Sequence, residues 1–179
     1  YYVLGKKERH TLADYVTGVE ETSTNKIVLY SSAQTGKTTE LKQLCWELQQ
    51  SGLYLPVSFE VRTNTKLKRD DLPESQYVDG REVVLVIDAL DEVNGQKYED
   101  LLEEIGGYAY EHPEMKMVLS YRSNFRRERQ LELFTELFLE ELSIDDARDY
   151  AAKREVNSDR FMRSVFANQL EDFIKNPFF

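Results

Sequence analysis

Residues 26–50 constrain the fold more than any other part of the chain, because they predict a buried strand, a polar loop and a helix in direct succession. Lys26–Tyr30 is a compact apolar run with β-branched members, too short for a helix. Ser31–Gly36 is small and polar, and Lys37–Gln50 repeats apolar residues at the helical period, with Gly52 as a stop signal. This order predicts an α/β chain in which parallel strands alternate with helices.

The same alternation continues along the chain. We expect further strands at Tyr54–Val61, Val83–Ile87, Met117–Tyr121 and Leu137–Leu142. We expect further helices at Thr11–Val19 and Gln96–Glu111, from an N-cap at Ser143 through Lys153, and at Ser158–Ile174. Pro56 argues that the second strand begins outside the ladder, and the Gly106-Gly107 pair should end or kink its helix. Thr63–Gly80 should be irregular, with a short helix.

These elements predict two parts of unequal size. Residues 1–142 should form a three-layer αβα sandwich around a central parallel sheet. Residues 143–179 are expected to be all helical and to begin a small separate domain, a lid. The first residue is Tyr1 and the last are Pro177-Phe178-Phe179, so we expect a fragment of a longer protein.

Composition excludes several classes of protein. Apolar residues make up 41% and charged residues 31% of the 179 residues, which argues against disorder. The net charge of −10 makes direct binding to nucleic acid unexpected. Cys45 is the single cysteine, which excludes an internal disulfide and a cysteine-rich zinc site and favours a cytoplasmic setting. The longest aliphatic run, Val83–Ile87, is far shorter than the about 18 residues that cross a bilayer, so no membrane partner is expected.

The loop after the first strand has the context and most of the residues of a phosphate-binding P-loop. Gly36 can adopt the backbone angles that aim successive N–H groups at a phosphate, and the following helix adds its positive end. The Lys37 ammonium would reach the β and γ oxygens, and the Thr38 hydroxyl would be a Mg²⁺ ligand. Ser31 stands where the full pattern has its first glycine, and the alternative is a purely structural turn. The predicted phosphate-binding residues are Ser32, Ala33, Gln34, Thr35, Gly36, Lys37, Thr38 and Thr39.

An apolar strand that ends in acids supplies the second motif. Val83–Ile87 is followed directly by Asp88-Ala89-Leu90-Asp91-Glu92. Asp88 has the position of the Walker B acid, which supports Mg²⁺, and Asp91 or Glu92 would orient or deprotonate the attacking water. The alternative is a solvated acidic turn, although three adjacent carboxylates without a cation would repel one another.

Arginines follow the next strand. Arg122 comes directly after an apolar strand and would lie at the same sheet edge, where it would sense a γ-phosphate or, alternatively, pair with surface acids. The simplest interpretation of the cluster Arg126, Arg127 and Arg129 is a solvent-exposed run of charges. The alternatives are that the cluster binds an acidic partner or a neighbouring subunit's nucleotide. The chain lacks the Asn-Lys-x-Asp element with which GTPases bind guanine, so adenine is the favoured base.

Together these motifs resemble the NACHT clade of the STAND P-loop ATPases, which are related to AAA+ proteins. The Asp88–Glu92 motif after a GKT loop carries the resemblance, and Ser120-Tyr121-Arg122 is similar to the clade's sensor 1. Val3–Glu8 is similar to the segment that cups adenine, which assigns a nucleotide contact to Gly5. Asn176-Pro177-Phe178 resembles the element that touches the nucleotide from the lid side, which assigns a contact to Pro177.

The resemblance implies a slow ATPase that binds ATP or ADP with Mg²⁺ and acts as a nucleotide-controlled switch, in bacterial defence or signalling. Its implied partners are the effector and sensor domains of a longer parent chain and, in the full-length protein, further copies in a nucleotide-dependent homo-oligomer. Two alternatives remain open. One is a P-loop kinase that phosphorylates a small acceptor, and the other is an assembly scaffold that does not hydrolyse nucleotide, which the departure at Ser31 would favour.

Overall fold

The structure is a computed structural model that describes residues 11–18, 24–32, 35–61, 67–90, 93, 96–122, 131–139, 143–154 and 156–174. These residues form two compact units. One holds residues 11–32 and 37–139, and the other holds residues 35–36 and 143–174. Among the described helices, none combines the length and the apolar character needed to cross a membrane.

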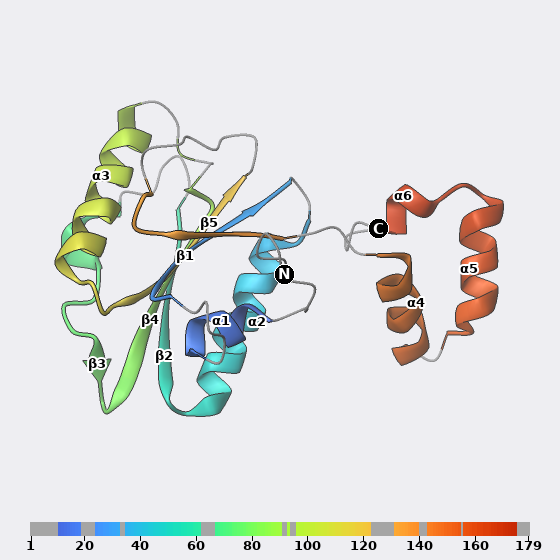
Figure 1. Ribbon diagram of the computed structural model, residues 1–179, viewed down its shortest axis with the longest axis horizontal. Helices are drawn as coiled ribbons and strands as arrows, with labels where there is room; N and C mark the ends of the chain where they lie inside the picture. The colour runs from blue at the N-terminus through green and yellow to red at the C-terminus, as the bar shows by residue number, and fades with distance from the viewer. Residues whose placement is uncertain are drawn as a thin grey trace. The chain divides into compact units, whose positions relative to one another are not determined.

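A six-stranded sheet forms the centre of the first unit (Figure 1). Its strands are β1 (Lys26–Ser31), β2 (Tyr54–Glu60), β3 (Tyr77–Val78), β4 (Arg81–Asp88), β5 (Lys116–Arg122) and β6 (Thr135–Phe138). They lie in the order β2-β4-β5-β1-β6 with parallel pairing throughout, while β3 pairs with the start of β4 in the antiparallel sense. The strand that leads into the phosphate-loop motif, β1, is therefore separated by β5 from the strand that ends in the acids, β4.

Helices cover both faces of this sheet. α3 (Gln96–Glu111) lies on one face, and α1 (Leu12–Thr17) and α2 (Lys37–Ser51) lie on the other (Figure 1). Alternate residues of each strand enter the two cores: Leu85 packs in the α3 core, whereas Val84 and Val86 pack in the α2 core. Because both faces are buried, the strands need continuous apolar runs rather than alternation. The predicted αβα sandwich with a central parallel sheet is confirmed.

The second unit is helical. It contains α4 (Ile144–Lys153), α5 (Ser158–Ala167) and α6 (Glu171–Ile174). The predicted N-cap at Ser143 is confirmed: its hydroxyl accepts from the Asp146 backbone N–H at 3.1 Å, and the Asp146 carboxylate accepts from Ser143 in return. The single helix predicted for Ser158–Ile174 is wrong, because the chain leaves the helix after Ala167 and Gln169 has a φ of +55°.

Two expectations about proline and glycine are also wrong. Pro56 lies within the ladder, in register with Val84, and is tolerated because β2 is an edge strand whose outer side needs no N–H donor. The Gly106-Gly107 pair does not end α3, which runs through to Glu111. The apolar stripe of α3, anchored by the buried Ile105, offsets the weak helix propensity of glycine.

Two strands differ from the expected ones. The short strand β3 was not predicted, although Asp79-Gly80 between β3 and β4 is a strong hairpin signal; both residues have positive φ, +50° and +75°. The strand expected at Leu137–Leu142 is β6, which begins earlier, at Thr135, and ends at Phe138. The remaining strands lie within one or two residues of their predicted bounds.

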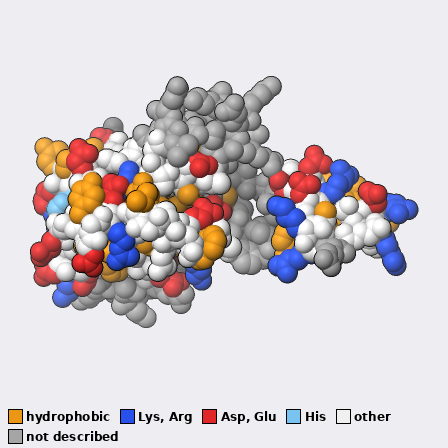
Figure 2. All heavy atoms as spheres, turned by 90° about the horizontal axis from the view of Figure 1, so that it is seen from below, with side chains coloured by type: hydrophobic (Ala, Val, Ile, Leu, Met, Phe, Trp, Pro, Cys, Tyr) orange, Lys and Arg blue, Asp and Glu red, His pale blue; other side chains and the backbone are white. Residues whose placement is uncertain are grey.

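Charged side chains of both signs are interspersed on the face shown in Figure 2. Among the described residues on this face, Lys and Arg do not gather into one continuous patch.

Candidate functional site

The carboxyl ends of the central strands meet at one edge of the sheet. Ser31 at the end of β1 is in register with Arg122 at the end of β5. On the other side of β5, Ile87 is in register with Leu119, so Asp88 follows beside Ser120. Ligands of open parallel sheets bind at this edge, beyond the carboxyl ends of the strands.

Asp88 is held by two hydroxyl groups. It is 8% exposed, and its Oδ2 accepts a hydrogen bond of 2.7 Å from Thr38 Oγ1 at the start of α2. Its Oδ1 accepts a hydrogen bond from the fully buried Ser120 hydroxyl. Ser120 Oγ in turn accepts a hydrogen bond of 3.0 Å from the backbone N–H of Ala89. These bonds fix the orientation of the Asp88 carboxylate. Its Oδ2 faces Thr38 at the start of α2.

The start of α2 lies beside this carboxylate. Lys37 is the first residue of the helix and is half-buried, and Thr38 is the second. Gly36 directly precedes them in the chain and has a φ of +95°, a conformation that favours glycine strongly over residues with a Cβ. Ser31, the residue that departs from the P-loop pattern, is 3% exposed, and its hydroxyl donates to the Ser32 carbonyl at 3.0 Å. The end of β1 therefore accommodates the small serine side chain at this position.

The donor set of Thr38 and Asp88 fits Mg²⁺. Hydroxyl and carboxylate oxygens are hard ligands, and here they already lie in contact across 2.7 Å. Among the residues that the structure describes, no group of three or more His, Cys, Asp or Glu side chains could hold a metal ion. A pair of this kind suits an ion that takes its remaining ligands from water and a nucleotide phosphate, as Mg²⁺ does.

Four other predicted residues of this region are described, namely Ser32, Thr35, Thr39 and Arg122. Ser32 is exposed and Thr35 is half-buried. Arg122 is half-buried and ends β5 at the edge that carries Asp88. Thr39 is exposed on the first turn of α2. The predicted residues Gly5, Ala33, Gln34, Asp91, Glu92 and Pro177, and the cluster Arg126, Arg127 and Arg129, lie outside the described residues.

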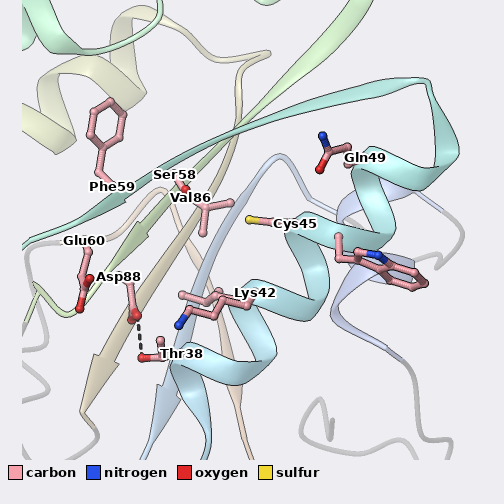
Figure 3. Close-up of a pocket in the computed structure, with 11 residues that line it drawn as sticks. Thr38, Lys42, Cys45, Gln49, Ser58, Phe59, Glu60, Val86 and Asp88 are labelled. Carbon is pink, nitrogen blue, oxygen red and sulfur yellow. Dashed lines mark hydrogen bonds between the residues drawn. The ribbon is translucent and has the colours of Figure 1, made fainter.

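A pocket of about 340 Å³ extends from Thr38 and Asp88 along α2 toward the edge strand β2 (Figure 3). Its lining residues are Thr38, Leu41, Lys42, Cys45, Trp46, Gln49, Ser58, Phe59, Glu60, Val86 and Asp88. Cys45 is half-buried on the pocket wall and packs against the core, and burial raises the pKa of its thiol. Trp46 is 56% exposed at the pocket.

Sequence reasoning missed Ser120 as the partner of Asp88 and the pocket residues on α2 and β2. The helical spacing of Thr38, Lys42, Cys45 and Gln49 places these residues on one face of α2, which was a usable signal. The pairing of β2 with β4 could not be predicted in this way, because it depends on the order of strands in the sheet.

Comparison with solved structures finds a similar fold in Hsp104. The matching chain comes from a closed-state cryo-EM reconstruction of Hsp104 with ATPyS and FITC casein, with a TM-score of 0.53 and 15% sequence identity. The shared fold is an α/β arrangement with a central, mostly parallel sheet flanked by helices. The match covers 78% of this chain but only 27% of the Hsp104 chain, so it concerns about a quarter of that chain. Comparison with protein-family models and with curated proteins finds no match.

Proposed function

We propose that the first unit binds ATP or ADP together with Mg²⁺ at the edge formed by the start of α2 and the end of β4. The observation that carries this proposal is the hydrogen bond between Thr38 Oγ1 and Asp88 Oδ2, which joins the predicted phosphate loop to the predicted Walker B acid. The P-loop fold shared with Hsp104, whose reconstruction contains ATPyS, supports the same reading.

Each residue has a distinct task in this proposal. The N-terminal turn of α2 and the backbone at Gly36 attract the phosphates, and the Lys37 ammonium pairs with their outer oxygens. Thr38 and Asp88 hold Mg²⁺ directly or through its water shell, and Ser120 keeps the Asp88 carboxylate turned toward it. The bound Mg²⁺ would neutralise phosphate charge and orient the terminal phosphate.

Hydrolysis would then need a positioned water and a group that senses the γ-phosphate. We assign the first task to Asp91 or Glu92 and the second to Arg122, which lies at the same edge as Asp88. Contacts of Gly5 and Pro177 with the nucleotide belong to the same proposal. Turnover would be slow, because a switch needs a long-lived bound state.

More specifically, we propose that the protein acts as a NACHT-type switch. On this view nucleotide exchange in a longer cytoplasmic parent chain controls oligomerisation and the activity of attached effector and sensor domains, in bacterial defence or signalling. The motif Asp88–Glu92 and the Ser120-Tyr121-Arg122 strand end are the residues that favour it.

Isothermal titration with Mg-ADP and Mg-ATP tests the binding proposal. We expect Lys37→Ala to weaken binding by about 10- to 100-fold, because it removes charge-assisted hydrogen bonds to phosphate. Lys68→Ala, which removes an exposed lysine before the short helix η1 (Arg69–Asp71), serves as the matched control and should bind as the wild type does. Absence of binding by the wild-type chain, or equal affinity of the Lys37→Ala variant, would contradict the proposal.

A further inference from the structure

The two oxygens of the Asp88 carboxylate face different surroundings. Oδ2 accepts the hydrogen bond of 2.7 Å from Thr38, whose side chain is exposed at the start of α2 (Figure 3). Oδ1 accepts a hydrogen bond from the hydroxyl of Ser120 on β5, a residue with no exposed surface. One oxygen of Asp88 therefore lies on the side of the proposed phosphate loop, and the other is directed toward the interior of the sheet.

The backbone that follows Asp88 fixes the Ser120 hydroxyl. A hydroxyl has one proton to donate and also accepts hydrogen bonds. Because Ser120 Oγ accepts the Ala89 N–H at 3.0 Å, its proton is directed to Asp88 Oδ1. The Asp88 carbonyl in turn accepts the N–H of Val61, directly after β2, at 3.0 Å. The peptide group between Asp88 and Ala89 is thus held from both sides, so the bond from Ser120 to Oδ1 rests on a fixed backbone.

Mg²⁺ and Ca²⁺ differ in how they use a carboxylate. Mg²⁺ is octahedral, with ligands at about 2.0–2.1 Å, and keeps several of its waters. Ca²⁺ takes about six to eight oxygens at about 2.3–2.6 Å and often binds both oxygens of one carboxylate. A carboxylate with one oxygen held by a buried hydroxyl offers a single oxygen to an ion. The arrangement at Asp88 therefore suits Mg²⁺ better than Ca²⁺.

We propose that Ser120 is a positioning residue that sets the metal preference of the nucleotide site. By holding Oδ1, it restricts Asp88 to one oxygen and favours Mg²⁺ over Ca²⁺. This inference rests on the proposed function, since the metal is the one that accompanies the nucleotide. Without the hydroxyl, Oδ1 is released and the carboxylate can turn to bind Ca²⁺ with both oxygens. A purely structural role of Ser120 would weaken the binding of both metal complexes alike, so the ratio of the two affinities distinguishes the roles.

The test is isothermal titration with ADP in excess Mg²⁺, in excess Ca²⁺ and in EDTA. The wild type should bind Mg-ADP more tightly than Ca-ADP. For Ser120→Ala we expect the ratio of the Mg-ADP affinity to the Ca-ADP affinity to fall by about tenfold or more, because losing a group that orients a metal-binding carboxylate commonly costs about 10- to 100-fold. ADP affinity in EDTA should equal that of the wild type.

Two further variants accompany Ser120→Ala. Ser120→Cys is close to serine in size and carries only a weak S–H donor, so it preserves the packing of this fully buried position and should also lower the ratio. Ser58→Ala removes an exposed hydroxyl from β2 and is the control, which should leave all three affinities unchanged. Circular dichroism shows whether each variant is folded.

The outcomes separate the two proposals. If the folded Ser120 variants keep the wild-type ratio, or lose affinity for both metal complexes equally, the assignment of Ser120 is wrong and the nucleotide site stands. Equal affinity of the wild type for Mg-ADP and Ca-ADP would also overturn the inference alone. If the wild-type chain binds ADP under none of the three conditions, both proposals fail.

Discussion

Thr38 Oγ1 and Asp88 Oδ2 lie 2.7 Å apart although 50 residues separate them in the chain. The fold explains this contact. β4 lies beyond β5 from β1, and α2 packs on the face that buries Val84 and Val86 of β4, so the start of α2 reaches the end of β4. The contact therefore depends on the strand order of the sheet as well as on the geometry of the site.

Ser120→Ala should destabilise the protein. The hydroxyl is fully buried, donates to Asp88 and accepts from the Ala89 N–H, so the variant leaves a buried carboxylate oxygen and a backbone N–H without this partner. We expect a loss of about 1–3 kcal/mol in the free energy of unfolding, measured by urea denaturation. Ser58→Ala, which removes an exposed hydroxyl from β2, should change stability by less than about 0.5 kcal/mol. Equal stability of the two variants would refute the role of Ser120.

Alanine at two glycines should have opposite effects. Gly36 has a φ of +95°, so Gly36→Ala should cost about 1–2 kcal/mol in stability and weaken Mg-ADP binding. Gly106 lies within α3, and a Cβ there would meet no other atom within 4 Å. Gly106→Ala should therefore raise stability by about 0.5–1 kcal/mol through helix propensity and leave binding unchanged. Thermal denaturation with and without Mg-ADP measures both effects; a Gly36→Ala variant that binds normally would contradict the loop assignment.

Tyr108 should make stability fall at alkaline pH. Burial raises the pKa of its hydroxyl, against a smaller opposing effect of Arg69, and the hydroxyl donates to the Pro73 carbonyl at 2.7 Å. The unfolded chain releases this proton near pH 10 while the folded chain retains it, so the contribution of Tyr108 is complete below pH 10 and declines above it.

Tyr108→Phe tests this contribution. The variant should be less stable by about 1 kcal/mol at pH 7, and its difference from the wild type should shrink as the pH rises above about 10. Urea denaturation at both pH values gives the two differences. Tyr110→Phe, at a residue that is 78% exposed on the same helix, is the control. A difference for Tyr108→Phe that stays constant or grows with pH would show that the hydroxyl makes no such contribution.

Local pattern was sufficient to predict most elements of the fold. The apolar runs of β1, β4 and β5 are long enough to identify buried strands, and capping residues located the start of α4. Pro56 misled the prediction because a proline's cost depends on whether its strand lies at an edge, which only the sheet order reveals. The helix expected at Ser158–Ile174 failed because its apolar period continues past the break at Gln169.

Contacts between distant segments could not be predicted from the sequence. Lys26 begins a strand whose other residues are apolar or small, yet its Nζ is buried and donates to the carbonyls of His112, Pro113 and Met115 at 2.8–2.9 Å. The sequence likewise predicted Asp88 as the metal-supporting acid but did not predict that Ser120 and Glu60 flank it. Those neighbours follow from the pairing of β4 with β5 and with β2.

A double-mutant cycle on Thr38 and Asp88 tests the central claim most directly, namely that the two side chains hold one Mg²⁺ for one nucleotide. The measurement is the free energy of ADP binding gained on adding Mg²⁺, for the wild type, Thr38→Ala, Asp88→Asn and the double variant. Residues that act on one ion should be non-additive, with a coupling energy of about 1 kcal/mol or more and a double variant scarcely weaker than the worse single variant. Strictly additive losses, or a Mg²⁺ gain that survives in the double variant, would contradict the account.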